Sequence, residues 1–166
     1  MDKIIIVDKD DQPIALKRYD EAGYQDIHRV SALWLTDART GDCLITQRKW
    51  TKHHDPGKWM AAASGTVDKG ETYQQNMVKE IEEEIGLTGL SLAAGPKEFV
   101  DDGQHKFFVQ WFIAQTDKDK AVIKIQEEEV EAYAWVNKTE LIKDVTENPD
   151  KYVPSMRNAL KILRVL

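Results

Sequence analysis

Cys43 is the only cysteine among the 166 residues of this chain. A single cysteine excludes an internal disulfide and any metal site built from several thiolates. It is also usual for a protein kept in a reducing compartment. No apolar run approaches the ~18 residues that span a membrane, and the first residues lack the pattern of a signal peptide. We therefore expect a cytoplasmic protein with no membrane partner.

Basic residues are also scarce. Lysine and arginine number 23 against 29 aspartates and glutamates, which gives a net charge of −6. No basic run is long enough to follow the phosphates of DNA or RNA, which argues against a nucleic acid polymer as a partner. Local basic groups still allow a small phosphorylated ligand. The hydrophobic fraction of 42% and the charged fraction of 31% are those of a globular protein, and the length predicts one domain over residues 1–166.

Neither internal repeats nor low-complexity segments interrupt the chain, and its hydrophobic pattern changes between strand and helix periods. We expect helices over residues 72–85, 137–143 and 154–166. Strands are expected over residues 3–7, 13–17, 28–35, 43–48, 97–100, 106–115 and 132–136, with a shorter extended piece at 59–63 and a hairpin loop at 37–42. Mixed strands with three helices predict a single-domain α/β (α+β) fold.

The helix expected over residues 72–85 carries Glu80, Glu83 and Glu84 along one edge of its apolar stripe. Carboxylates at i, i+3 and i+4 repel one another. They also lie near the helix C-terminus, where negative charge is unfavourable. An arrangement that is unfavourable on both counts suggests a missing positive partner, and Mg²⁺ or Mn²⁺, which prefer oxygen ligands, would supply it. The alternative is a solvated acidic helix face.

The residues around these carboxylates favour the metal site over the solvated face. Gly65 precedes the helix, Thr72 is placed to cap it, and Gly86 follows its last turn, where a left-handed residue is common. The pattern over residues 65–87, Gly-x5-Glu-x7-Lys-Glu-Ile-x-Glu-Glu-x-Gly-Leu, resembles the Nudix box. Its single departure is Lys79, which stands where the Nudix box usually has arginine.

The resemblance to the Nudix family implies a mixed β-sheet sandwiched between helices. It also implies hydrolysis of a small organic diphosphate with Mg²⁺ or Mn²⁺ as cofactor, the diphosphate being either a nucleoside diphosphate linked to another moiety or an isoprenoid-like one. Carried over by position, Glu80, Glu83 and Glu84 are the expected metal ligands. Glu71, Glu80 and Glu83 are the expected catalytic residues, with Glu71 orienting the motif or touching the metal through water. Lys79 would pair with a carboxylate of the box, more loosely than arginine does.

The general base stays open at this point. Glu83 is one candidate, and a glutamate of residues 127–129 is the other, because in several Nudix enzymes the base comes from a later loop. Residues 127–129 also fit an exposed charged turn with no catalytic role.

Residues 28–59 are similar to one Nudix branch, the isopentenyl-diphosphate isomerases and their hydrolase-like relatives. The shared features are a His-Arg strand, a Gln-Arg-x-x-x-Lys segment and a Pro-Gly-x-Trp turn. The resemblance implies that Arg48 and Lys52 face the diphosphate. The Cys and His that isomerases use fall at Ser64 and Thr66 here, and a serine hydroxyl is too weak an acid for that chemistry. We therefore expect a hydrolase, with an isomerase and a non-catalytic diphosphate-binding module as alternatives.

In this family, loops outside the box read the group attached to the diphosphate, here residues 19–24, 49–58 and 100–106. None of these loops contains a residue pattern that identifies a particular substrate group, so the sequence leaves the substrate open. Trp50 and Trp59 are expected in the core, because aromatic residues next to strands usually pack there. The oligomeric state is also open, and it includes a homodimer.

Overall fold

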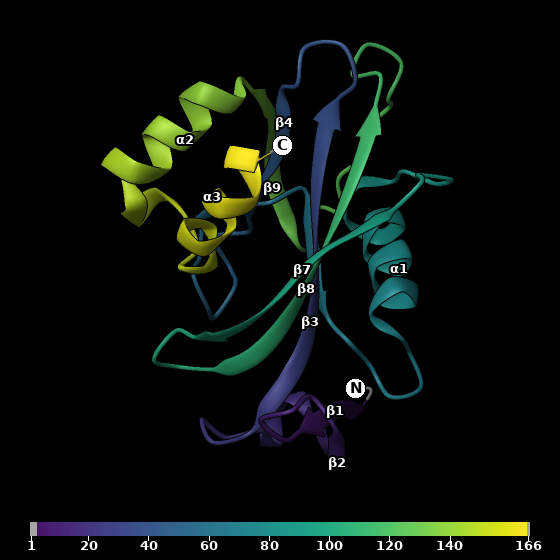
Figure 1. Cartoon of the computed structure of the whole chain (residues 1–166), viewed down its shortest axis with the longest axis vertical. Helices are drawn as coiled ribbons and strands as arrows, with labels where there is room; N and C mark the ends of the chain where they lie inside the picture. The colour runs from purple at the N-terminus through teal and green to yellow at the C-terminus, as the bar shows by residue number, and fades with distance from the viewer. Residues whose placement is uncertain (1–2, 166) are drawn as a thin grey trace.

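The computed structural model describes residues 3–165, which form a mixed β-sheet with helices on both faces (Figure 1). This is the α/β sandwich that the sequence predicted. The helices are α1 (Tyr73–Ile85), α2 (Lys138–Glu147) and α3 (Ser155–Val165), with the 3-10 turns η1 (Tyr19–Glu21) and η2 (Pro149–Lys151). The strands are β1 (Lys3–Val7), β2 (Pro13–Arg18), β3 (Ile27–Asp37), β4 (Cys43–Arg48), β5 (Trp59–Met60), β6 (Ala63–Thr66), β7 (Ala93–Asp101), β8 (Lys106–Thr116) and β9 (Val130–Val136).

Strand β3 is the centre of the sheet. It pairs in parallel with β8 along its whole length, from Ile27 opposite Lys106 to Asp37 opposite Thr116. It also pairs antiparallel with β1 near its start and with β6 further along. The hairpin partners β2 and β7 extend the sheet beyond β1 and β8.

Strands β3 and β4 diverge directly after the loop that joins them. They pair only at Thr36 and Cys43, and from there β4 pairs with β9. The segment 59–66 bridges the diverging strands, because β5 pairs with β4 while β6 pairs with β3. The single extended piece expected at 59–63 is therefore wrong: it is interrupted at Ala61 and Ala62, where the chain crosses from one strand to the other.

Each face of the sheet has its own hydrophobic core. Helix α1 packs on one face, and α2 and α3 pack on the other (Figure 1). The α1 core includes Leu33, Leu44, Met77, Ile81 and Ile85, and the opposite core includes Trp34, Trp111, Leu141, Met156 and Leu160. Within residues 3–165, no helix is both long and apolar enough to cross a membrane.

Helix α1 has the boundaries that its terminal residues predict. The Thr72 side chain accepts a hydrogen bond from the Gln75 N–H, and the Gln75 side chain accepts one from the Thr72 N–H. Gly86 ends the helix with φ 69°, a left-handed conformation that favours glycine.

Other boundaries differ from the sequence prediction. Strand β7 begins at Ala93 rather than residue 97, because its register shifts between Ala94 and Lys97 and its residues are mostly exposed, which leaves no clear alternation. Helix α2 continues to Glu147, four residues beyond the predicted end. The last helix was expected over 154–166; α3 spans Ser155–Val165, and residue 166 lies outside the described residues.

Candidate functional site

The polar edge of α1 lies against β6. Glu84 is buried, and its Oε2 accepts a hydrogen bond of 3.0 Å from the Ser64 backbone N–H. Glu80 lies over Gly65 so closely that a Cβ at Gly65 would be 2.2 Å from Glu80 Cδ. A residue with a side chain cannot occupy position 65 unless Glu80 moves. Gly65 and the Ser64 backbone N–H are therefore the two groups of β6 that contact these carboxylates.

Burial disfavours the charged form of both carboxylates more than Lys79 favours it at Glu80 or Arg48 at Glu84. Burial raises the pKa of Glu80 to about 7, and the neighbouring Glu83 carboxylate adds to the rise. Burial also raises the pKa of Glu84 to about 8, although the hydrogen bond from the Ser64 N–H lowers that pKa. The negative charges of Glu80 and Glu129 raise it further. Glu83 itself is exposed. A carboxyl group with a pKa raised in this way, such as Glu80 or Glu84, holds a proton near neutral pH or binds a cation in place of the proton.

Lys79 neutralises the other end of the motif. Its Nζ lies 2.9 Å from Glu71 Oε1 and 2.9 Å from Asp68 Oδ2, but 4.0 Å from Glu80 Oε1. Burial alone would raise the pKa of Glu71, yet the hydrogen bonds from Lys79 and Asn76 outweigh it and lower that pKa. Lys79 does pair with a carboxylate of the box, and that carboxylate is Glu71 rather than one of the expected metal ligands.

Asn76 is a buried polar residue that the sequence analysis missed. Its Nδ2 donates to Glu71 Oε2 (3.1 Å), to Glu80 Oε1 (3.3 Å) and to the Thr66 carbonyl oxygen (3.1 Å). Its Oδ1 accepts a hydrogen bond of 2.6 Å from Ser31 Oγ. The amide thus links Glu71, which precedes α1, and Glu80 on α1 to β3 and β6. A single asparagine within a helix gives no sequence signal, except that it lies on the buried stripe four residues before Glu80.

The carboxylates of α1 are the donors available to a metal ion. Among the described residues, no three acidic, histidine or cysteine side chains converge closely enough to hold an ion unaided. Their chemistry nevertheless fits a hard cation: the donors are all carboxylate oxygens, and burial desolvates two of them, Glu80 and Glu84. Glu80, Glu83 and Glu84 lie within two turns of one helix, and they are the residues that would hold such an ion.

The two basic residues singled out in the sequence differ in their surroundings. The Lys52 Nζ forms an ion pair with Glu129. Arg48 Nε donates to the His54 carbonyl oxygen at 3.1 Å, and the Arg48 charge is close enough to Glu84 to lower its pKa slightly against the effect of burial. The structure therefore places the Arg48 charge within electrostatic range of Glu84, whereas Lys52 is already paired.

The loop that contains residues 127–129 reaches the end of α1. The backbone N–H of Gln126 donates to the Glu84 carbonyl oxygen at 3.1 Å, which fixes this loop to the helix. Glu129 is half-buried beside Lys52 and raises the pKa of Glu84, while Glu127 and Glu128 are exposed. Of the three glutamates, Glu129 is the one that lies near the site.

A pocket of about 170 Å³ lies where β3 and β4 diverge, on the face of the sheet that α3 covers. Ser64 and Arg48 line this pocket. Since the Ser64 N–H also holds Glu84, one wall of the pocket is shared with the polar edge of α1. The rest of the lining combines apolar and polar side chains: Val30, Ala32, Met60, Val109, Trp111 and Met156 are apolar or aromatic, and Asp55, Asp102, Gln104 and Ser155 are polar.

All three loops expected to read the substrate contribute to the mouth of this pocket. Tyr19 comes from the first loop, His54 from the second and His105 from the third. The His54 and His105 rings pack edge to face, with 4.6 Å between their centroids. The Tyr19 ring is stacked with that of His105, with 6.5 Å between the centroids. The His28 ring packs edge to face on that of His105, with 6.3 Å between their centroids. Burial lowers the pKa of His28 to about 4, which suits the structural role of an uncharged histidine.

The two tryptophans expected in the core differ. Trp59 packs against the core on the α3 face, but Trp50 is 64% exposed, so its prediction is wrong. Trp50 lies against Gly57, where a Cβ would come within 2.3 Å of its ring. The ring therefore packs on the loop backbone instead of entering the sheet.

Comparisons with known proteins agree with this geometry. The model of the NUDIX domain family matches residues 26–158. A Nudix hydrolase of Yersinia pestis is 26% identical over 162 residues, covering 95% of this chain and 82% of that protein. An isopentenyl-diphosphate Delta-isomerase of Cereibacter sphaeroides is 32% identical over 124 residues, covering 70% of this chain and 69% of that protein.

The fold has a close counterpart among solved structures. A crystal structure from Deinococcus radiodurans superposes with a TM-score of 0.79 at 18% identity, and the match covers 98% of this chain and 97% of that one. At that identity the likeness concerns the fold alone. Together with the match of the family model over most of the chain, it leads to one conclusion: the chain belongs to the Nudix family and is a Nudix hydrolase.

Proposed function

We propose that this enzyme hydrolyses a small organic diphosphate with the help of Mg²⁺ or Mn²⁺. The observation that carries the proposal is the pair of desolvated carboxylates, Glu80 and Glu84, next to a pocket that contains Arg48. Glu80, Glu83 and Glu84 would hold the cation. When bound there, a hard cation would neutralise phosphate oxygens and lower the pKa of a water molecule.

The protein side chains would supply positioning and charge. Arg48 would bind the diphosphate from the pocket wall. Lys52 would add a second positive charge, either after its ion pair with Glu129 breaks or while that pair persists. Water would attack one phosphorus, the bond from that phosphorus to the bridging oxygen would break, and this oxygen would leave with the other phosphate. Lys79 and Asn76 would keep Glu71 and Glu80 in place.

The proton of the attacking water needs an acceptor. Glu83 is exposed on α1, and Glu129 lies near Glu84 but is engaged by Lys52. Glu83 is exposed and forms no ion pair with a lysine or arginine among the described residues, so it would be the base if Glu80 and Glu84 carried the cation at the moment of attack. A positively paired carboxylate is a weaker base.

Isomerisation of a prenyl diphosphate is the competing reaction, because isomerases are among the relatives. That reading needs an acid strong enough to protonate carbon. Ser64 lines the pocket where the acid would be required. Cys43 is fully buried in the core between α3 and the sheet, where burial raises the pKa of its thiol to about 11. The hydrolase is therefore the reaction we propose.

The test is a screen of nucleotide, sugar and prenyl diphosphates with Mg²⁺ or Mn²⁺, followed by ³¹P NMR. Hydrolysis of at least one diphosphate is expected, and Glu83→Gln should lower its kcat by about 10²- to 10⁴-fold while leaving the circular dichroism spectrum unchanged. Glu82→Gln is the matched control, since Glu82 is an exposed neighbour to which we assign no role. Unchanged turnover in Glu83→Gln would remove the assignment of this residue.

The screen also separates the alternatives. Interconversion of isopentenyl and dimethylallyl diphosphate without hydrolysis would establish an isomerase, and binding without any reaction would establish a non-catalytic module. The cytoplasmic location, the single domain over residues 1–166 and the homodimer remain predictions from the sequence.

A further inference from the structure

The pocket lies where the non-reacting part of a diphosphate substrate would be. Arg48 lines it and acts electrostatically on Glu84, and Ser64 lines it while its N–H holds the same carboxylate at 3.0 Å. A diphosphate placed between Arg48 and the carboxylates of α1 would therefore project its organic group into this pocket. This step rests on the proposed function.

The pocket is small. Its volume of about 170 Å³ is close to that of an apolar cavity of roughly 150 Å³, which binds benzene. A single ring or a short branched hydrocarbon fills such a space. A nucleoside, which joins a sugar to its ring system, would have to leave much of itself outside.

Part of the pocket lining is apolar, whereas Asp55, Asp102 and Gln104, which come from the same loops as His54 and His105, are polar. Val30, Ala32 and Val109 present only hydrocarbon, and Met60 and Met156 add flexible thioethers. Among the described residues that line the pocket, the buried polar atom without a hydrogen-bond partner is Trp111 Nε1. A nucleobase carries several donors and acceptors, and burying them without partners is costly.

The mouth of the pocket is aromatic. Tyr19, His54 and His105 come from three separate loops and contact one another through their rings. Flat rings at an entrance favour a planar or apolar group that passes between them. Two of the three, Tyr19 and His54, are also exposed, so a bound group would cover them.

We infer that this pocket selects diphosphates whose organic group is a single ring or a short branched hydrocarbon, with Tyr19, His54 and His105 as the specificity-determining residues at its entrance. Whole nucleosides are selected against by the size of the pocket and by the apolar side chains of Val30, Ala32 and Val109.

The first test compares three substrates in the wild type and in Val30→Phe, which fills the pocket. Phenyl diphosphate and isopentenyl diphosphate have groups that occupy it, and methyl diphosphate does not. In Val30→Phe, kcat/KM should fall about tenfold or more for the first two and by a clearly smaller factor for methyl diphosphate. Val122→Phe, at a residue that is 67% exposed, is the matched control and should affect none of them. Equal loss for all three substrates, or no loss, would overturn the inference.

The second test does not depend on turnover. Tryptophan fluorescence in EDTA should show phenyl diphosphate binding about tenfold more tightly than ADP, and His105→Ala should reduce that preference. Tighter binding of ADP would overturn the inference even if the enzyme proves to be a pyrophosphohydrolase. Failure of every diphosphate to be hydrolysed, with this binding preference intact, would instead overturn the proposed reaction.

Discussion

Gly65 is the residue on which the contact between β6 and the polar edge of α1 depends. Its φ is not positive, so the backbone does not require glycine there. The requirement comes from Glu80, whose carboxyl group occupies the space of a Cβ. Asn76 and Lys79 hold the neighbouring carboxylates, so a displacement at position 65 would pass to Glu71 as well.

Gly65→Ala should lower both stability and activity. The added methyl group must displace Glu80, and overpacking of this kind typically costs about 1–3 kcal/mol. Urea unfolding and metal-supported turnover would measure the two effects. Gly23→Ala is the matched control: its φ is not positive either, and its Cβ would meet its nearest atom at an ordinary 3.8 Å. Equal behaviour of the two variants would contradict the role of Gly65.

At the scale of elements, sequence signals were reliable where terminal residues define an element. Thr72 and Gly86 delimit α1, and its predicted range of 72–85 is confirmed to within one residue. The pocket could not be predicted, because it forms only where β3 and β4 diverge and three distant loops meet. Asn76 was missed for the same reason: its role depends on partners from β3 and β6 that the sequence does not place beside it.

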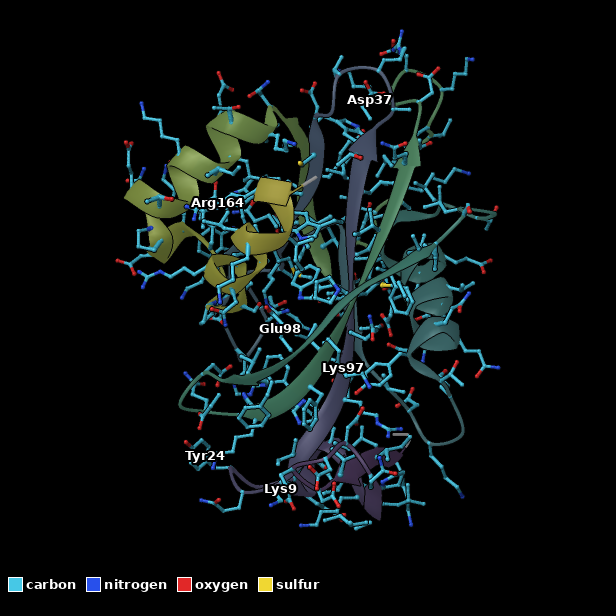
Figure 2. All side chains as sticks on the ribbon, viewed as in Figure 1. Lys9, Tyr24, Asp37, Lys97, Glu98 and Arg164 are labelled. Atoms are coloured by element: carbon cyan, nitrogen blue, oxygen red, sulfur yellow. The ribbon has the colours of Figure 1, made fainter. Side chains whose placement is uncertain are left out.

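Asp37 fixes the turn between β3 and β4 to the end of β8. It accepts hydrogen bonds from the Lys118 N–H (2.9 Å) and from the Thr40 N–H (2.9 Å) and hydroxyl (2.8 Å). The hydrogen bond from Lys118, together with those from Thr40, lowers the pKa of Asp37 to about 2. In Figure 2 Asp37 lies at the end of the molecule opposite Lys9 and Tyr24, so this contact is independent of the first strands.

Acid should weaken this turn. A carboxyl group whose pKa is lowered by folding adds stability that is present above its unfolded pKa, about 3.9. That stability is lost as the pH falls from about 4 to about 2, the folded pKa. Asp37→Asn should unfold at a lower urea concentration than the wild type at pH 7, and the gap should narrow toward pH 2. A gap that does not change with pH would contradict this account.

At the scale of the whole molecule, Asp11 connects four parts of the fold. It lies in the turn between β1 and β2 and accepts hydrogen bonds from Arg29 on β3 (2.7 Å), Lys97 on β7 (2.6 Å) and Tyr73 on α1 (3.1 Å). Its side chain is 10% exposed. Its φ of 59° is left-handed, a conformation that aspartate and asparagine tolerate better than most residues.

Asp11→Ala should destabilise the protein by about 1.5–3 kcal/mol, because it removes the hydrogen bonds to the largely buried Arg29 and to Tyr73, while Lys97 is exposed and loses less. Asp11→Asn keeps the backbone preference and should isolate the effect of the charge. Asp20→Ala is the control, since Asp20 forms an exposed ion pair with Arg18; such pairs contribute about 0–1 kcal/mol. Chemical denaturation would compare the three, and similar losses for Asp11→Ala and Asp20→Ala would refute the role of Asp11.

The central claim is that α1 holds carboxylates for a divalent cation, and isothermal titration with Mn²⁺ near pH 7 tests it most directly. Saturable binding is expected, with release of protons, because burial raises the pKa of Glu80 to about 7 and of Glu84 to about 8 in the free protein. The measured heat should therefore change with the ionisation enthalpy of the buffer. Glu84→Gln should weaken the binding, and Glu82→Gln should not. No binding at millimolar Mn²⁺ or Mg²⁺, with or without methylenediphosphonate, would contradict the account.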